Sequence, residues 1–246
     1  MDGNVIFKYA NPTRFMTLSR AMLPWLLVLT VASFGIGLYG GLWIAPPDYQ
    51  QGETVRIMFV HVPAAWMAMA TYSFMALASL VGMVWKHPLA DVAAKSAAPI
   101  GACFTFLALV TGSLWGKPMW GTWWVWDARL TSMLVLFFLY LGYIAIWQTI
   151  EEPVKAGRVA AILAMVGFVN IPIIKFSVDW WNTLHQPASI MRMDGPAIYI
   201  SILWPLLVMI LGFSLLFSVL LLVAMRSEII RRRIRSIRIA KIEGFG

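Results

Sequence analysis

Long apolar runs separated by short polar segments dominate the pattern of this chain. Six runs reach the roughly 20 residues that a helix needs to cross a hydrocarbon core about 30 Å thick. They fall at about 23–44, 57–85, 92–115, 128–149, 159–178 and 199–225. The runs show no alternation of apolar and polar positions, and an unclosed sheet would leave backbone groups unpaired in lipid. The pattern predicts an all-α membrane protein, a bundle of six transmembrane helices.

The composition agrees with this prediction. The chain has 246 residues, of which 61% are hydrophobic and 12% are charged, and its mean hydropathy is +0.78. Soluble domains carry about 25% charged residues. The sequence has no internal repeat or low-complexity linker, so we expect residues 1–246 to form a single membrane domain. The first run is too long for the roughly 7–15-residue core of a cleaved signal peptide, and we expect it to be retained.

The basic residues predict how the bundle is oriented. Fourteen of the nineteen Lys and Arg residues lie in the N-terminal segment, near 86–98, in 150–158 and in the tail 226–246. Since such residues favour the cytoplasmic side, we expect both termini to be cytoplasmic. Three segments then face outward, at roughly 45–56, 116–128 and 179–198. A juxtamembrane tail beside anionic lipid explains the net charge of +8 without a nucleic acid partner.

The second outer segment is strongly aromatic. Its tryptophans are Trp115, Trp120, Trp123, Trp124 and Trp126. If the segment is helical, Trp120, Trp124 and Asp127 share one face and form a stacking platform with a polar end. The alternative is the aromatic belt that lines membrane interfaces, but a belt spreads its rings around the bundle. The concentration of rings favours a flat, apolar ligand.

Two of the three histidines, His61 and His185, fall on the predicted outer side, whereas His87 falls on the cytoplasmic side. A single interfacial histidine is typical of a snorkelling or hydrogen-bonded side chain. Two neutral imidazoles on one face can instead fill both axial positions of a heme iron. The pair therefore favours a heme site.

A porphyrin also needs partners for its faces and its two carboxylates. Indole rings can cover the faces, and arginine can bind a carboxylate through two parallel hydrogen bonds. The cations expected outside are Arg56, Arg129, Lys117 and Arg192. Each of them can equally be a solvated charge. Asp127 can pair with Arg129 or Lys117, bond to the backbone, or hold a ligand, and the sequence leaves these alternatives open.

Several classes of function are disfavoured by the sequence. It contains no Walker motif, no nucleophile paired with a base, and no cluster of acidic metal ligands. Its one cysteine, Cys103, excludes an intrachain disulfide and a zinc site built on several thiolates. We therefore expect a binding subunit without catalytic residues, and any ATP-driven step belongs to another subunit.

The segment Trp120 to Ser132 resembles the tryptophan-rich WWD signature of heme-handling membrane proteins. Further matching stretches lie at 46–52, 56–63, 112–118 and 180–186. On these motifs the chain is identified as a member of the heme exporter protein C (CcmC) family of bacterial cytochrome c maturation. The likeness runs from about residue 20 to about residue 225.

The resemblance implies that His61 and His185 are the axial ligands of heme b and that the WWD segment holds the heme. It implies delivery of heme, at the periplasmic face of the inner membrane, to the heme chaperone CcmE. The other implied partners are the ABC transporter subunits CcmA and CcmB and the small membrane protein CcmD. The competing readings are a heme lyase that forms the thioether to apocytochrome c, and a membrane scaffold or permease with a dense aromatic belt. The lyases are longer chains with extra histidines.

Overall fold

The computed structural model describes residues 11–181, 183–186, 189–190, 194–242 and 244. The helices are α2 (Pro12–Tyr39), η1 (Gly40–Ile44, a π-helical turn), η2 (Glu53–Ile57, a 3₁₀ helix), α3 (Met58–Trp85), α4 (Ala90–Trp120), α5 (Ala128–Thr149), α6 (Pro153–Gly167), α7 (Asn170–Trp180) and α8 (Ile200–Ile242). The described residues form no strand, and one isolated bridge joins Asp48 to Gly52. Six helical segments of the described chain are long and apolar enough to cross a membrane. The predicted all-α membrane bundle is confirmed.

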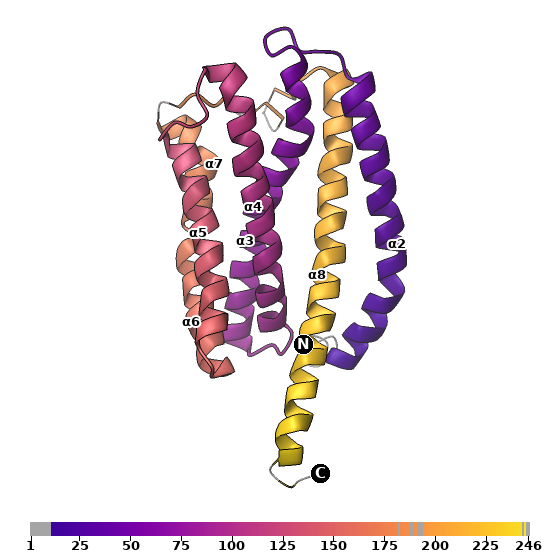
Figure 1. The fold of residues 1–246 in the computed structure, drawn as a ribbon, viewed down its shortest axis with the longest axis vertical. Helices are drawn as coiled ribbons and strands as arrows, with labels where there is room; N and C mark the ends of the chain where they lie inside the picture. The colour runs from indigo at the N-terminus through magenta and orange to yellow at the C-terminus, as the bar shows by residue number, and fades with distance from the viewer. Residues whose placement is uncertain (1–10, 182, 187–188, 191–193, 243, 245–246) are drawn as a thin grey trace.

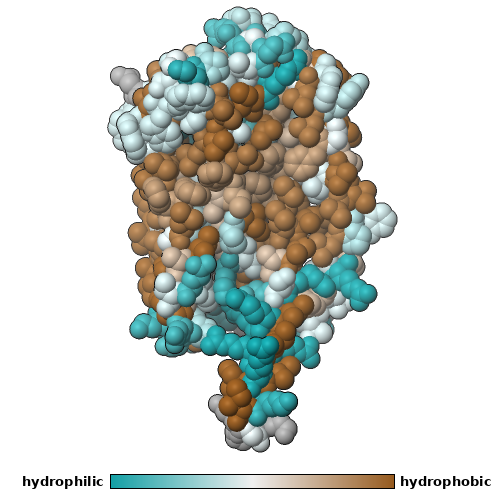
Figure 2. Space-filling model, in the orientation of Figure 1, coloured by the Kyte–Doolittle hydropathy of each residue, from teal (hydrophilic) through white to brown (hydrophobic). Residues whose placement is uncertain are grey.

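The helices are arranged around the central pair α3 and α4. Helices α5, α6 and α7 lie on one side of this pair, and α8 lies on the other side with α2 outermost (Figure 1). The apolar window of α2 is only 17% buried, against 44% for α4, so α2 is the helix most exposed to lipid. A brown apolar band separates two hydrophilic ends in Figure 2, as expected for a chain that crosses a bilayer.

Small residues let the central helices approach one another closely. Gly101 of α4 faces the phenol of Tyr140 from α5, and a Cβ at this glycine would overlap that ring. The Tyr140 hydroxyl donates to the carbonyl of Ala68 in α3 at 2.8 Å, and its ring packs edge-on against Tyr72 with centroids 5.1 Å apart. Because lipid is as apolar as the helices, such close packing and interhelical hydrogen bonds stabilise the bundle.

The fifth predicted run is two helices rather than one. Helix α6 ends at Gly167 and α7 begins at Asn170. Pro172 explains the break, because proline lacks an N–H and its ring collides with the carbonyl four residues earlier, here that of Phe168. Together the two helices still form one span, from Pro153 to Trp180.

Three other helices are longer than the apolar runs suggested. Helix α2 begins at Pro12, because the Asn11 side chain accepts a hydrogen bond from the Thr13 N–H at 2.8 Å and caps the helix. Helix α4 runs on past residue 115 to Trp120. The basic tail beyond residue 225 continues α8 as helix to Ile242 and projects below the bundle in Figure 1.

A group of charges joins α8 to the bundle where the basic tail begins. The Glu228 carboxylate accepts from Lys95 of α4 at 3.0 Å and from Arg232 at 2.9 Å, and it also pairs with Arg231. Arg226 donates to the Met16 carbonyl of α2 at 2.6 Å. The start of α2 and the basic end of α8 therefore lie at the same end of the molecule.

Candidate functional site

The opposite end of the bundle carries most of the residues singled out by the sequence, and the end of α4 is its centre. Trp115 and Trp120 lie in the last turns of this helix. Gly121 then ends the helix in a left-handed conformation with φ +76°, which suits glycine because it has no Cβ. Residues 122–127 are not helical. The expectation that Trp120, Trp124 and Asp127 share one helical face is therefore wrong.

His61 lies in the first turn of α3 and packs against α4. Its Nδ1 is 3.0 Å from the hydroxyl oxygen of Thr111. Its ring meets Trp115 edge-on, with centroids 5.6 Å apart. Gly112 leaves room for the ring, because a Cβ there would lie 3.0 Å from the imidazole Cε1. Three neighbouring residues of α4 thus hold this imidazole.

His185 lies in the irregular segment after α7. Its ring packs against Trp120 with centroids 4.9 Å apart. Its Nδ1 is 3.4 Å from Oδ2 of Asp127 and 3.4 Å from the hydroxyl oxygen of Thr183. Its backbone N–H donates to the same hydroxyl oxygen at 3.0 Å. The imidazole is therefore held by α4, by the start of α5 and by its own loop.

Asp127 connects the start of α5 to the segment that carries His185. Oδ1 accepts the backbone N–H of Leu130 at 2.7 Å and so caps α5, while Oδ2 accepts the Thr183 hydroxyl at 2.7 Å. The side chain is only 5% exposed, and burial raises the pKa of the carboxyl. The hydrogen bonds from Leu130 and Thr183, with the nearby His185, outweigh burial and leave this pKa below its usual value. The side chain therefore bonds to backbone and to the His185 segment.

The two outer imidazoles form a pair. His61 packs on Trp115 and His185 on Trp120, and both tryptophans lie in the last turns of α4. Burial lowers the pKa of His185, and the Asp127 carboxylate offsets this only in part. The imidazole is therefore neutral at pH 7, as a metal ligand must be. His87 lies at the far end, where Nδ1 accepts the Leu89 N–H at 3.3 Å.

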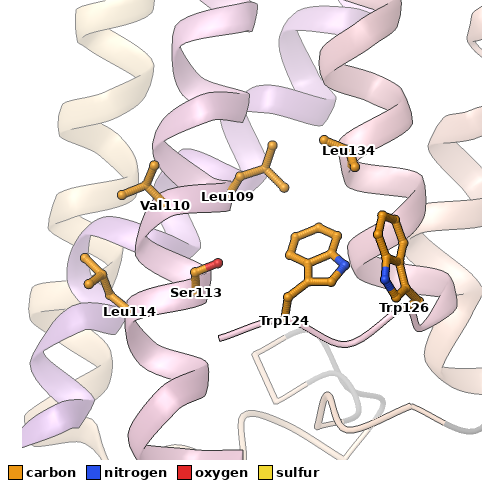
Figure 3. A pocket seen from close by; sticks show the side chains of 7 residues that line it. All are labelled: Leu109, Val110, Ser113, Leu114, Trp124, Trp126 and Leu134. Carbon is orange, nitrogen blue, oxygen red and sulfur yellow. The ribbon is translucent and has the colours of Figure 1, made fainter. Parts of the chain in front are cut away.

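Of the remaining tryptophans of the WWD segment, Trp124 and Trp126 border a groove, and Trp123 is exposed. Trp124 and Trp126 meet edge-on with centroids 5.5 Å apart, and they border an apolar groove of about 500 Å³ between α4 and α5 (Figure 3). The groove is also lined by Leu109, Val110, Ser113, Leu114 and Leu134. These α4 residues lie on the opposite side of the helix from Thr111 and Trp115, which hold His61. Trp123 and Trp126 are 55% and 75% exposed.

The candidate cations make hydrogen bonds to backbone. Arg56 donates through Nη1 to the carbonyl of Gly41 at 2.9 Å and to that of Leu42, at the π-helical end of the first span. Arg129 donates to the Ser177 hydroxyl at 3.1 Å and to the Lys175 carbonyl at 3.3 Å, tying α5 to α7.

Two more cations complete the candidate set. Lys117 donates to the Gly121 carbonyl at 3.0 Å and lies 5.9 Å from the Trp123 ring centroid. Arg192 lies outside the described residues.

Three residues of the site were not singled out from the sequence. Thr111 and Thr183 contact the two imidazoles, and Gln51 accepts the Trp115 indole N–H at 3.1 Å. Gln51 and Thr183 lie in the family-like stretches 46–52 and 180–186, but those stretches do not show which side chains they contact. The contacts of Thr111 and Gln51 join segments that are far apart in the chain.

The ligand set fits heme better than a bare metal ion. Within the described ranges, no three side chains among His, Cys, Asp and Glu gather as a metal site. A zinc site takes three or four ligands from the protein. A porphyrin supplies four ligands to its own iron, so two imidazoles complete six-coordination. His61 and His185 with the rings of Trp115 and Trp120 match that need.

These features define a polytopic α-helical membrane protein with paired imidazoles and indoles at one end. A family model described as "CcmC: Heme exporter protein C" matches residues 5–240. "Heme exporter protein C" of Bradyrhizobium diazoefficiens is 63% identical over 93% of this chain and 86% of its own length. The protein of the same name from Escherichia coli K12 is 49% identical, over 92% of this chain and 91% of its own length. A "Putative cytochrome c biosynthesis ccmC-like mitochondrial protein" of Marchantia polymorpha is 49% identical over 79% of this chain and 82% of its own length. The chain belongs to the heme exporter protein C family.

Proposed function

We propose that this chain binds heme b between His61 and His185 and delivers it to the periplasmic chaperone CcmE during cytochrome c maturation. The observation that carries the proposal is the imidazole pair at the end of α4. Each ring is held through Nδ1 and packed against an indole. Metal-binding histidines characteristically bind through one ring nitrogen while the other is held by a polar partner.

The proposed role is transfer rather than catalysis. His61 and His185 would hold the iron, and Trp115 and Trp120 would cover the porphyrin and exclude water from it. Heme supplies the iron and four of its ligands. Trp124 and Trp126 of the WWD segment extend the apolar surface toward the groove, and Trp123 belongs to the same segment. Arg56, Arg129 and Lys117 are the candidate partners of the propionates.

The proposed orientation places this site outside a bacterial inner membrane. The tail of α8, which holds seven basic residues between Arg226 and Lys241, projects from the end opposite His61 and His185. Basic residues are retained on the cytoplasmic side, so the imidazole pair would face the periplasm. The ABC transporter subunits CcmA and CcmB and the small membrane protein CcmD would work beside this chain.

Co-expression with the chaperone tests the delivery step. The chaperone is purified from cells that make this chain as wild type, His61→Ala, His185→Ala or His87→Ala, and its covalently bound heme is measured. We expect heme on the chaperone with wild type and His87→Ala, and at least a tenfold loss with the other two variants, since each removes one of the two axial ligands. Equal heme in all four samples would contradict the proposal.

The heme lyase alternative makes a different prediction. A lyase would attach heme to a Cys-containing apocytochrome peptide in the absence of the chaperone. Thioether formation by the purified chain and heme alone would therefore favour that function. We expect none, because the chain has only the two outer histidines to hold heme.

A further inference from the structure

We propose that the hydroxyls of Thr111 and Thr183 are positioning groups that fix both outer histidines in the Nδ1–H tautomer, so that each Nε2 keeps its lone pair for iron. This inference rests on the proposed heme function and adds the residues that prepare the two ligands. A neutral imidazole carries one proton, and the nitrogen that holds it is set by the hydrogen bond made on the other side of the ring.

Thr111 carries the argument for His61. Its hydroxyl has one proton and lies 2.7 Å from the Leu107 carbonyl, one turn earlier in α4. A carbonyl can only accept, and this contact is shorter than the 3.0 Å contact with His61 Nδ1, so the geometry favours a hydroxyl that donates to Leu107 and presents a lone pair to His61. In this arrangement Nδ1, which is 3.0 Å from that oxygen, carries the hydrogen of the bond. Nε2 is then the unprotonated nitrogen.

Thr183 repeats the arrangement at His185. Its hydroxyl lies 2.7 Å from Oδ2 of Asp127. The carboxylate can only accept, so the proton of this bond belongs to the threonine. The two oxygens that face His185 Nδ1, each at 3.4 Å, are therefore both acceptors. They favour a hydrogen on Nδ1, and Nε2 again keeps its lone pair.

Both anchors include a threonine hydroxyl, but they differ in distance and in charge. His61 meets a neutral hydroxyl, while His185 also faces the Asp127 carboxylate. A carboxylate behind an imidazole makes it a more basic ligand. The Thr111 anchor lies on a regular helix, and the Thr183 anchor belongs to the loop that carries His185. The pair would thus offer iron two ligands of unequal strength, each oriented before heme arrives.

Nitrogen-15 NMR of the heme-free protein tests the tautomers directly. The full chain, labelled at its three histidines and placed in lipid nanodiscs, is measured near pH 8, where imidazoles of ordinary pKa, about 6.5, are neutral. Signals are assigned by single His→Gln variants. We expect His61 and His185 to show Nδ1–H. An Nε2–H signal at either residue would overturn the proposal for that residue.

Hydroxyl removal then tests the two threonines. We expect Thr111→Val to shift His61 toward Nε2–H, and Thr183→Val to weaken the preference at His185. Thr111→Ser and Thr183→Ser keep the hydroxyl and should retain the wild-type tautomers. Thr149→Val is the matched control, because that hydroxyl also donates to the carbonyl one turn earlier, at 2.8 Å, but at the other end of α5. If a Val variant fails to fold, the corresponding Ala variant is measured instead. Unchanged tautomers in the variants without hydroxyls would overturn the role of the threonines.

Heme binding separates this inference from the function on which it rests. Both Val variants should bind heme about 10- to 100-fold more weakly, as for losses of groups behind a metal ligand, with part of the ferric heme high-spin. Heme-free stability should stay near that of Thr149→Val. A wild-type protein that binds no heme would contradict the proposed function but leave the NMR result standing. Val variants with wild-type affinity and spectrum would contradict the inference while the function stands.

Discussion

Oδ2 of Asp127 lies 3.4 Å from Nδ1 of His185, a residue 58 positions later in the chain. The carboxylate that caps α5 is thus also the anchor of a loop imidazole. Because a helix start is a rigid support, this contact holds the His185 ring in one orientation although the residue lies in a loop.

Substitutions at Asp127 should separate its two roles. Asparagine caps a helix about as well as aspartate, so Asp127→Asn should change the free energy of unfolding by less than about 0.5 kcal/mol. It removes the negative charge behind His185, and heme affinity should fall about tenfold. Asp127→Ala should lower heme affinity by a similar factor and should also reduce the free energy of unfolding by about 1 kcal/mol. Heme titration and unfolding of each variant in detergent measure both effects. Wild-type affinity in Asp127→Asn would contradict the anchoring role.

The tryptophans should differ in importance according to their contacts. Trp120 packs on His185, whereas Trp126 is 75% exposed and packs on Trp124. We expect Trp120→Leu to weaken heme binding by about fivefold or more, because removing a desolvating ring contact of this kind costs about 1 kcal/mol or more. Trp126→Leu is the matched control and should have a smaller effect. Equilibrium heme titration ranks the two variants, and the reverse order would refute the assignment of Trp120 to the ligand pocket.

The close contact between α4 and α5 should be sensitive to a single methyl group. Gly101→Ala places a Cβ against the Tyr140 phenol and should destabilise the fold by about 1–3 kcal/mol through overpacking. Adding Tyr140→Leu removes the ring atoms and the hydroxyl that the new Cβ would overlap, so the double variant should lose less than the sum of the singles. Gly35→Ala, where nothing lies within 4 Å, is the control. Additive losses in unfolding titrations would rule out this contact as the cause.

The Glu228 group should contribute to stability at the basic end. The Glu228 side chain is 9% exposed, and that of Lys95, its partner in α4, is 21% exposed. Glu228→Gln leaves the lysine without its counter-charge, which should cost on the order of 2 kcal/mol for a partly buried pair. Arg235→Gln, on the exposed part of α8, should stay within about 0.5 kcal/mol of wild type. Chemical unfolding compares them, and equal stabilities would show that the pair contributes nothing.

The sequence predicted the spans well because lipid leaves a long apolar run few structures other than a helix. It predicted their ends less well. The tail of α8 stays helical although it is not apolar, and the break before α7 depends on one residue, Pro172, inside an apolar run. Helix ends depend on capping groups and local backbone conformation, which hydropathy does not report.

The site was predictable in its residue types but not in its arrangement. The number of spans and the distribution of basic residues predicted that His61 and His185 lie on the same side of the membrane. In the structure both rings pack against the end of α4. Trp120, Trp124 and Asp127 do not form a stacking platform on one helical face, because Gly121 ends α4. The hydroxyl of Thr111 was missed because its contact joins residues 50 positions apart, and a single sequence does not show which distant segments meet.

Absorption spectra test the central claim most directly. The wild-type chain, His61→Ala, His185→Ala and His87→Ala are purified with the chaperone, checked for intact folding and measured in detergent. Bis-histidine ligation predicts a low-spin, six-coordinate spectrum for the wild type and for His87→Ala. The other two variants should lose heme or become high-spin. Four identical spectra, or no heme in any sample, would contradict ligation by His61 and His185.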